Sequence, residues 1–210
     1  AWQQLHKVGA KAEGTLLELW KSDDQRIRAR ALHLLARIKG AEKKYINLAL
    51  KDNNPDIRIT GIRIARERGL DVIPFVKKMV NDKDAGVRRA CAIALRHNES
   101  PEAPALWTKL AQQHDGKDRW YLEAFGLALD KQQDKFFGAW LEAIGSDWDT
   151  PAGRDIIWRS RSSKTSDLLV KILLNKKTKD EEKPRYIRAL DFQSGPEKDA
   201  ALIKLIGAGS

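Results

Sequence analysis

The chain is poor in cysteine and has no long apolar segment. Cys91 is its only cysteine, which excludes an intrachain disulfide, a cysteine-based zinc cluster and a CxxCH haem attachment within this sequence. No apolar run approaches the roughly 18 to 20 residues of a membrane span. No glycine-rich phosphate loop occurs, and the histidines (His6, His33, His97 and His114) share no metal-binding spacing. We therefore expect no cofactor, no metal and no catalytic residue in this chain.

Positive charge and a moderate apolar content are what the sequence does have. Lys and Arg number 39 against 29 Asp and Glu, a net charge of +10, and 42% of the residues are hydrophobic. Such a charge suits nucleic acid, anionic lipid or an acidic protein, and it says little about fold. A length of 210 residues fits a single domain, expected here over residues 1–210. The start at Ala1 and a single methionine, Met79, suggest a piece of a larger multidomain protein.

An internal repeat dominates the first half. Residues 24–31, 54–61 and 84–91 align without gaps at a period of 30. Each copy begins with a residue that can cap a helix, followed three positions later by a β-branched apolar residue and then by arginine. Apolar or small residues continue at i, i+4, i+7 and i+8, which predicts one buried stripe on each helix. A fourth copy begins at Asp118 and has Leu122 where the arginine is expected.

A second set of helix-like segments lies between these copies, and no stretch alternates with period two. The chain is therefore predicted to be all-α, with about six antiparallel helix pairs stacked as an α–α superhelix. The D/N-x-x-[I/V]-R pattern of residues 22–97 resembles the short variety of HEAT repeats. That resemblance implies a HEAT-like or armadillo-type solenoid.

The second half shows a narrower resemblance. Residues 117–126, 136–141, 150–158 and 185–195, with motifs such as RWYLEAFG and RYIRALDFQSG, are similar to one bacterial family. It comprises the large haem-binding, membrane-bound-dehydrogenase-like proteins of planctomycetes and their relatives. The resemblance implies that this chain is the repeat region of such a protein in a periplasmic or exported setting, with the haem and redox chemistry in other domains. No catalytic residue carries over.

One arginine recurs once in each repeat, at Arg28, Arg58 and Arg88. A stripe of this kind could track phosphates. It could instead be an internal ladder in which each arginine pairs with a carboxylate or carbonyl between repeats. We favour the ladder, because a fixed place in the repeat frame is what repeat packing requires. The expected partners lie near the start of the same helices: Asp24, Asp56 and Asp84.

Other basic and aromatic residues could form surfaces. Six other arginines of the first half are expected on an exposed basic face: Arg26, Arg30, Arg63, Arg66, Arg89 and Arg96. The candidate binding surface of the second half consists of Trp120, Trp148, Arg154, Trp158, Arg159 and Arg161. Aromatic rings beside arginines suit stacking on a base or sugar. Trp107 and Trp140 fall on apolar stripes and are expected in the core.

Two functions follow from these patterns. The favoured one is a non-catalytic scaffold or protein-interaction domain that docks flanking redox domains of the same chain or an acidic partner. The alternative is a nucleic-acid-binding HEAT-like protein related to alkylpurine DNA glycosylases. That alternative requires a concave cluster of tryptophans with several arginines and one unpaired carboxylate.

Overall fold

The computed structural model describes residues 3–4 and 8–208, and every regular element within these ranges is helical. The predicted all-α class is thus confirmed. Two short 3₁₀ helices, η1 (Gly9–Ala12) and η2 (Asp180–Glu182), accompany the α-helices. Across the described residues, no helix has both the length and the apolar character needed to cross a membrane.

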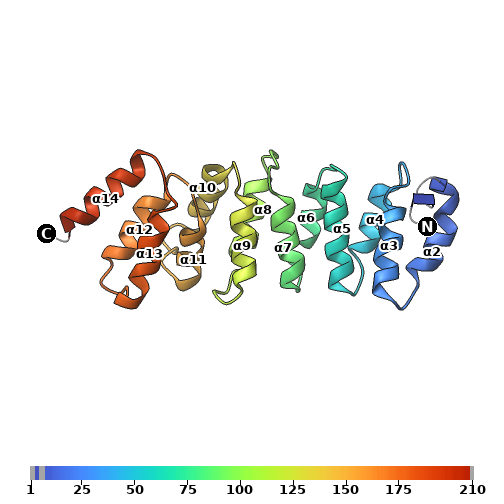
Figure 1. Ribbon diagram of the computed structural model, residues 1–210, viewed down its shortest axis with the longest axis horizontal. Helices are drawn as coiled ribbons and strands as arrows, with labels where there is room; N and C mark the ends of the chain where they lie inside the picture. Colours follow the sequence, from blue (N-terminus) through green and yellow to red (C-terminus); the bar gives the residue numbers. More distant parts are fainter. Residues whose placement is uncertain (1–2, 5–7, 209–210) are drawn as a thin grey trace. The chain divides into compact units, whose positions relative to one another are not determined.

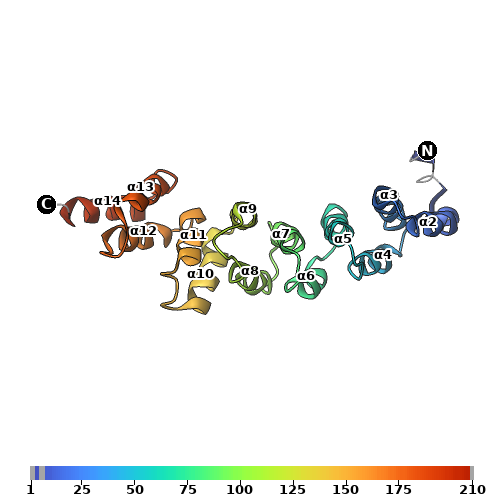
Figure 2. The ribbon, with the colours of Figure 1, turned by 90° about the horizontal axis from the view of Figure 1, so that it is seen from below.

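The chain divides into two compact units, and the first ends at Leu95. Its α-helices are α2 (Glu13–Trp20), α3 (Gln25–Leu35), α4 (Glu42–Ala49), α5 (Pro55–Glu67), α6 (Ile73–Met79) and α7 (Ala85–Ala94). Helices α3, α5 and α7 lie side by side in one layer, and α4 and α6 form a second layer (Figures 1 and 2). The first unit is therefore a stack of helix pairs.

The second unit begins at Arg96. Its helices are α8 (Ala103–Ala111), α9 (Arg119–Ala128), α10 (Gln133–Ile144), α11 (Pro151–Arg159), α12 (Thr165–Leu174), α13 (Lys183–Leu190) and α14 (Pro196–Ala208). Helix α8 packs on α10, α9 on α11, and α12 on both α13 and α14. This unit also stacks helices in pairs, so each unit by itself has the arrangement expected of a helical-repeat superhelix. That residues 1–210 form one domain stays a prediction.

The four predicted helix starts are confirmed by their capping bonds. The Asp24 and Asn54 side chains accept from the amides of Arg26 and Asp56, at 2.7 and 2.8 Å. Asp84 and Asp118 accept from the amides three residues on, at 3.1 and 3.0 Å. Each of the four residues has extended backbone angles. Such a cap stabilises a helix by about 1 kcal/mol, because it satisfies an amide that has no partner inside the helix.

The predicted apolar stripes form the core. The stripe residues of α5, α7 and α9 are all buried, whereas Ile27 at the start of the α3 stripe is half-buried. The surroundings of Gly61 explain why the repeat has a small residue at this position. A Cβ on Gly61 would lie 3.0 Å from the Cβ of Ala49 on the neighbouring helix. Cys91 holds the equivalent place in α7, where burial raises the pKa of its thiol to about 12, so it is a small packing residue and not a nucleophile.

The core of the second unit is aromatic. Trp107 is fully buried and meets Phe125 and Phe136 edge-on, at centroid distances of 5.6 and 6.3 Å. Trp140 is also buried and stacks on Phe137 at 5.4 Å. Both tryptophans are therefore core residues, as their spacing predicted.

Candidate functional site

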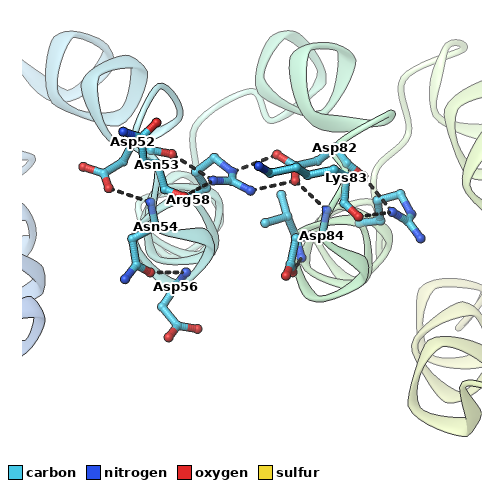
Figure 3. A network of polar contacts seen from close by, with 10 residues as sticks. Asp52, Asn53, Asn54, Asp56, Arg58, Asp82, Lys83 and Asp84 are labelled. Carbon is cyan, nitrogen blue, oxygen red and sulfur yellow. Dashed lines mark hydrogen bonds and ion pairs between the residues drawn. The ribbon is translucent and has the colours of Figure 1, made fainter.

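The arginine ladder is best seen at Arg58, in the first turn of α5 (Figure 3). Its guanidinium grips the Asp82 carboxylate with two parallel bonds, from Nε and Nη2, both 2.8 Å long. The third nitrogen, Nη1, donates to the carbonyls of Asp52 and Asn53 at 2.8 and 3.0 Å. The Arg58 and Asp82 side chains are only 7% and 8% exposed. Arg58 thus joins the turn before α5 to the turn before α7.

The neighbouring arginines make related contacts. Arg28 pairs with Asp52, donates from Nε to the carbonyl of Trp20 at 3.1 Å, and lies over the Trp20 ring. Arg88 donates from Nη1 to the carbonyls of Asp82 and Lys83, at 2.7 and 3.1 Å. All three guanidinium groups therefore meet carboxylates or carbonyls at the turns. None of these contacts requires a ligand.

The aspartates that pair with the ladder are not the predicted ones. Asp24 and Asp84 cap their own helices, and Asp56 lies exposed in the first turn of α5. The true partners, Asp52 and Asp82, lie two residues before a cap and 24 residues beyond the arginine they bind. The prediction was wrong because the cap carboxylates are already used by amides of their own first turns. The aspartate that lies two residues before the cap of the following repeat is free of that task and faces the arginine.

Asp82 serves both repeats at once. Its Oδ1 accepts from the amide of Asp84 at 2.9 Å as well as from Arg58. Burial opposes a charge on Asp82, but the hydrogen bonds from Arg58 and from the Asp84 amide outweigh it, so the pKa of this carboxyl lies below its usual value. Asp82 is therefore held as a carboxylate by the repeat interface.

Arg154 is a ladder residue that the sequence reasoning missed. It follows the cap residue Thr150 by four positions, as Arg58 follows Asn54, and its side chain is 12% exposed. Its Nη1 donates to Thr178 Oγ1 at 3.1 Å, again 24 residues on, and its Nε donates to Asp149 at 2.6 Å. Arg154 thus repeats the ladder geometry within the second unit. The signal in the sequence was the spacing from Thr150.

The structure does not gather the other candidate residues into one site. Trp120 is 72% exposed, whereas Trp148 is half-buried. Arg159 pairs with Glu123 at 2.9 Å. Arg161 donates to two nearby carbonyls and lies over the Phe192 ring. Of the six predicted surface residues, Trp158 lines a pocket of the second unit.

The ladder is interrupted in α9. The position four residues after its cap is Leu122, and two residues before the next cap stands Trp148, so both the arginine and its aspartate are replaced. Leu122, but not Trp148, lines the pocket, whose volume is about 290 Å³. Its lining is His114, Gly116, Lys117, Arg119, Leu122, Asp155, Trp158 and Arg185. The residues come from the loop after α8 and from α9, α11 and α13.

A chain of polar contacts forms one wall of the pocket. His114 Nε2 lies 3.0 Å from Asp155 Oδ2, and Arg185 Nη2 lies 2.6 Å from Asp155 Oδ1. The Arg185 guanidinium covers the face of Trp158, with Cζ 4.5 Å from the ring centroid. Burial opposes charge on Asp155, but the bonds from His114 and Arg185 outweigh it, and the pKa of Asp155 lies below its usual value. His114 Nδ1 is buried with no hydrogen-bond partner among the described residues.

Two cations at the pocket are not committed to this wall. The Lys117 side chain has no ion pair within the described residues. Arg119 is 80% exposed and makes only a loose contact with Glu123, at 3.7 Å. Because Asp155 is already paired with Arg185 and hydrogen-bonded to His114, the charge that remains at the pocket is positive.

The exposed arginines of the first unit lie on α3 and α5. Arg26, Arg30, Arg63 and Arg66 are exposed, and no ion pair to them is found in the described parts of the chain. Counted from the caps they occupy positions 2, 6, 9 and 12, a spacing that places them on one face of a helix. The prediction of an exposed face was wrong for Arg89 and Arg96, which are both half-buried. Arg96 pairs with Asp130 at 2.5 Å.

Fold and ladder together define a helical-repeat protein. Comparison with known families narrows the class: the family model described as HEAT repeats matches residues 42–125. This match supports the predicted HEAT-repeat region. No curated protein matches the chain. HEAT repeats are commonly scaffold or interaction modules, since stacked repeats present extended surfaces to partners.

Proposed function

We propose that this chain is a non-catalytic helical-repeat scaffold that binds an acidic protein through the arginines of α3 and α5. The observation that carries the proposal is that arginines of the first unit fall into two groups, one used in packing and one exposed. The ladder arginines are used in contacts at the repeat turns, whereas Arg26, Arg30, Arg63 and Arg66 are exposed and unpaired within the described residues. We call these four residues the basic face.

Charge complementarity favours an acidic partner for the basic face. Contacts between exposed charges are each worth about 0.2 to 1 kcal/mol and weaken with salt. Several such contacts together give weak, salt-sensitive binding that suits docking. The exported setting and the haem-binding parent protein rest on sequence resemblance and stay predictions.

A specific observation weakens the nucleic-acid alternative. The pocket of the second unit holds one tryptophan and one carboxylate, but Asp155 is paired twice and Arg185 covers the face of Trp158. The only carboxylate among the described residues that line this pocket is therefore paired, and one face of its tryptophan is covered. The alternative therefore enters as an outcome of the experiment below.

The test is binding of fluorescent poly-glutamate and of a duplex DNA oligonucleotide, followed by anisotropy at several salt concentrations. We expect Arg30→Gln with Arg63→Gln to weaken poly-glutamate binding about threefold to tenfold. The matched control, Lys176→Gln with Lys177→Gln, removes the same charge from the second unit and is expected to have less than a twofold effect. Tighter binding of DNA than of poly-glutamate at equal salt would instead support the nucleic-acid function, and equal losses in both variants would contradict the basic face.

A further inference from the structure

The pocket in the second unit is lined mainly by charged side chains. Leu122, which stands where the ladder has an arginine, belongs to its lining. A pocket also lies at a rung that keeps its arginine, because Trp20, Arg28 and Asp52 line a space of about 560 Å³ in the first unit. The leucine alone therefore does not explain the cavity, and the charged groups around it are what point to a ligand.

The excess of positive side chains around this pocket favours the binding of an anion. Lys117, Arg119 and Arg185 line it, against one carboxylate, Asp155. Arg185 is held by Asp155 and by the ring of Trp158. Lys117 and Arg119 are exposed and can turn toward a ligand. The pocket therefore has a fixed cation at its wall and two adjustable ones at its mouth.

The size and surroundings favour a side chain over a nucleotide. A volume of about 290 Å³ lies at the lower end of the roughly 300 to 1,000 Å³ of small-molecule sites. A phosphate backbone is recognised by several cations that neutralise successive phosphates, whereas Arg185, one of the three cations here, is already paired with Asp155. A base would stack on an aromatic face, and Arg185 covers one face of Trp158.

We propose that this pocket receives a glutamate or aspartate side chain of a partner protein, whose carboxylate pairs with Lys117 and Arg119. The inference rests on the proposed function only in the kind of partner, a protein with acidic side chains. It names a second contact point, separate from the basic face.

The decisive experiment titrates the whole chain with a capped, fluorescein-labelled tetraglutamate peptide, with the tetraglutamine peptide as the uncharged probe. We expect binding of the glutamate peptide only. Lys117→Ala with Arg119→Ala is expected to weaken it at least fivefold. The matched control is Lys176→Ala with Lys177→Ala, which removes two exposed lysines of the same unit and should change the affinity less than twofold.

A third variant, Leu122→Arg, separates pocket binding from general charge attraction. It adds a positive charge but places a longer side chain in the lining of the pocket, so it is expected to weaken binding at least fivefold. Attraction by net charge alone predicts tighter binding instead. A circular dichroism spectrum and a melt show whether this variant folds, and if it does not, the Lys117/Arg119 variant decides.

The outcomes are distinguishable from those for the basic face. Equal weakening by the Lys117/Arg119 variant and by the lysine control overturns the pocket proposal. If Arg30→Gln with Arg63→Gln reduces poly-glutamate binding while Lys117/Arg119 does not affect the tetraglutamate peptide, the pocket proposal fails and the proposed function stands. If a phosphoserine peptide or duplex DNA binds more tightly than the glutamate peptide and depends on Lys117 and Arg119, the assignment of a carboxylate partner is wrong.

Discussion

Replacing Arg58 with methionine removes the central rung of the ladder and keeps most of the apolar stem. The change deletes two bonds to the Asp82 carboxylate and two to the carbonyls of Asp52 and Asn53. Asp82, 8% exposed, would keep only its bond from the Asp84 amide. Removing one partner of a buried ion pair typically costs 3 to 5 kcal/mol, because the remaining charge is left buried. Since Asp82 retains one donor, we expect a loss near the lower end, about 3 kcal/mol.

The loss is measured by thermal and urea unfolding followed by circular dichroism. For a chain of this size, about 3 kcal/mol corresponds to a fall in Tm of roughly 6 to 12 °C. Arg63→Met is the matched control, because Arg63 lies on the same helix, is exposed and has no ion pair within the described residues. Its effect on the free energy of unfolding should stay within about 0.5 kcal/mol.

A double variant isolates the ion pair itself. Combining Arg58→Met with Asp82→Asn also removes the carboxylate charge that would be left without its partner. The double variant should therefore lose less free energy of unfolding than the two single variants added together, by about 1 kcal/mol or more. Two results would refute the ladder as a structural device. One is an unchanged melt for Arg58→Met, and the other is a loss of poly-glutamate or DNA binding by that variant with its stability intact.

Three further predictions follow from particular contacts. Because the folded pKa of Asp82 is lowered, its pairing adds stability above the unfolded pKa of about 3.9 and loses it as the pH falls through the folded value; unfolding below about pH 4 should therefore show an acid-induced loss that is reduced in Arg58→Met. Gly153→Ala would place a Cβ 2.1 Å from the Trp148 carbonyl oxygen, a backbone atom that cannot easily retreat, so urea titration should show a loss of at least about 2 kcal/mol. Gly126→Ala would place a Cβ 2.1 Å from the Arg159 guanidinium, which can swing away, and a gain of up to about 1 kcal/mol in helix propensity should bring the net change near zero; a large loss there would contradict this account.

Local features of the fold could be predicted from the sequence, because their causes lie within a few residues. A cap such as Asp84 binds an amide three positions on, so its residue type alone indicates the helix start. The buried stripes that begin at Ile57 in α5 and at Val87 in α7 follow from helical spacing in the same way. The small residue at Gly61 was visible in the repeat frame, although its cause, the approach of Ala49, was not.

The ladder partners could not be found by the same local reasoning. Asp82 lies 24 residues from Arg58, and only the stacking of one repeat on the next brings them together. The available signal was the aspartate two residues before a cap, seen at Asp52 and Asp82. Arg154 escaped notice because the spacing between caps changes after Asp84, so its place four residues after Thr150 no longer falls on the period of 30.

The candidate pocket depends on contacts that no sequence spacing indicates. His114, Asp155 and Arg185 come from a loop and two helices, and their meeting requires three successive repeat elements to stack in register. What the sequence did show was Leu122 in place of the ladder arginine. The repeat frame thus indicated that the α9 rung lacks its guanidinium, but it could not indicate which side chains surround Leu122. Those side chains come from four different elements, and a pocket also lies at the Arg28 rung, where the guanidinium is present. The shape of each rung therefore depends on the stacking of the repeats and not on the residue at the ladder position alone.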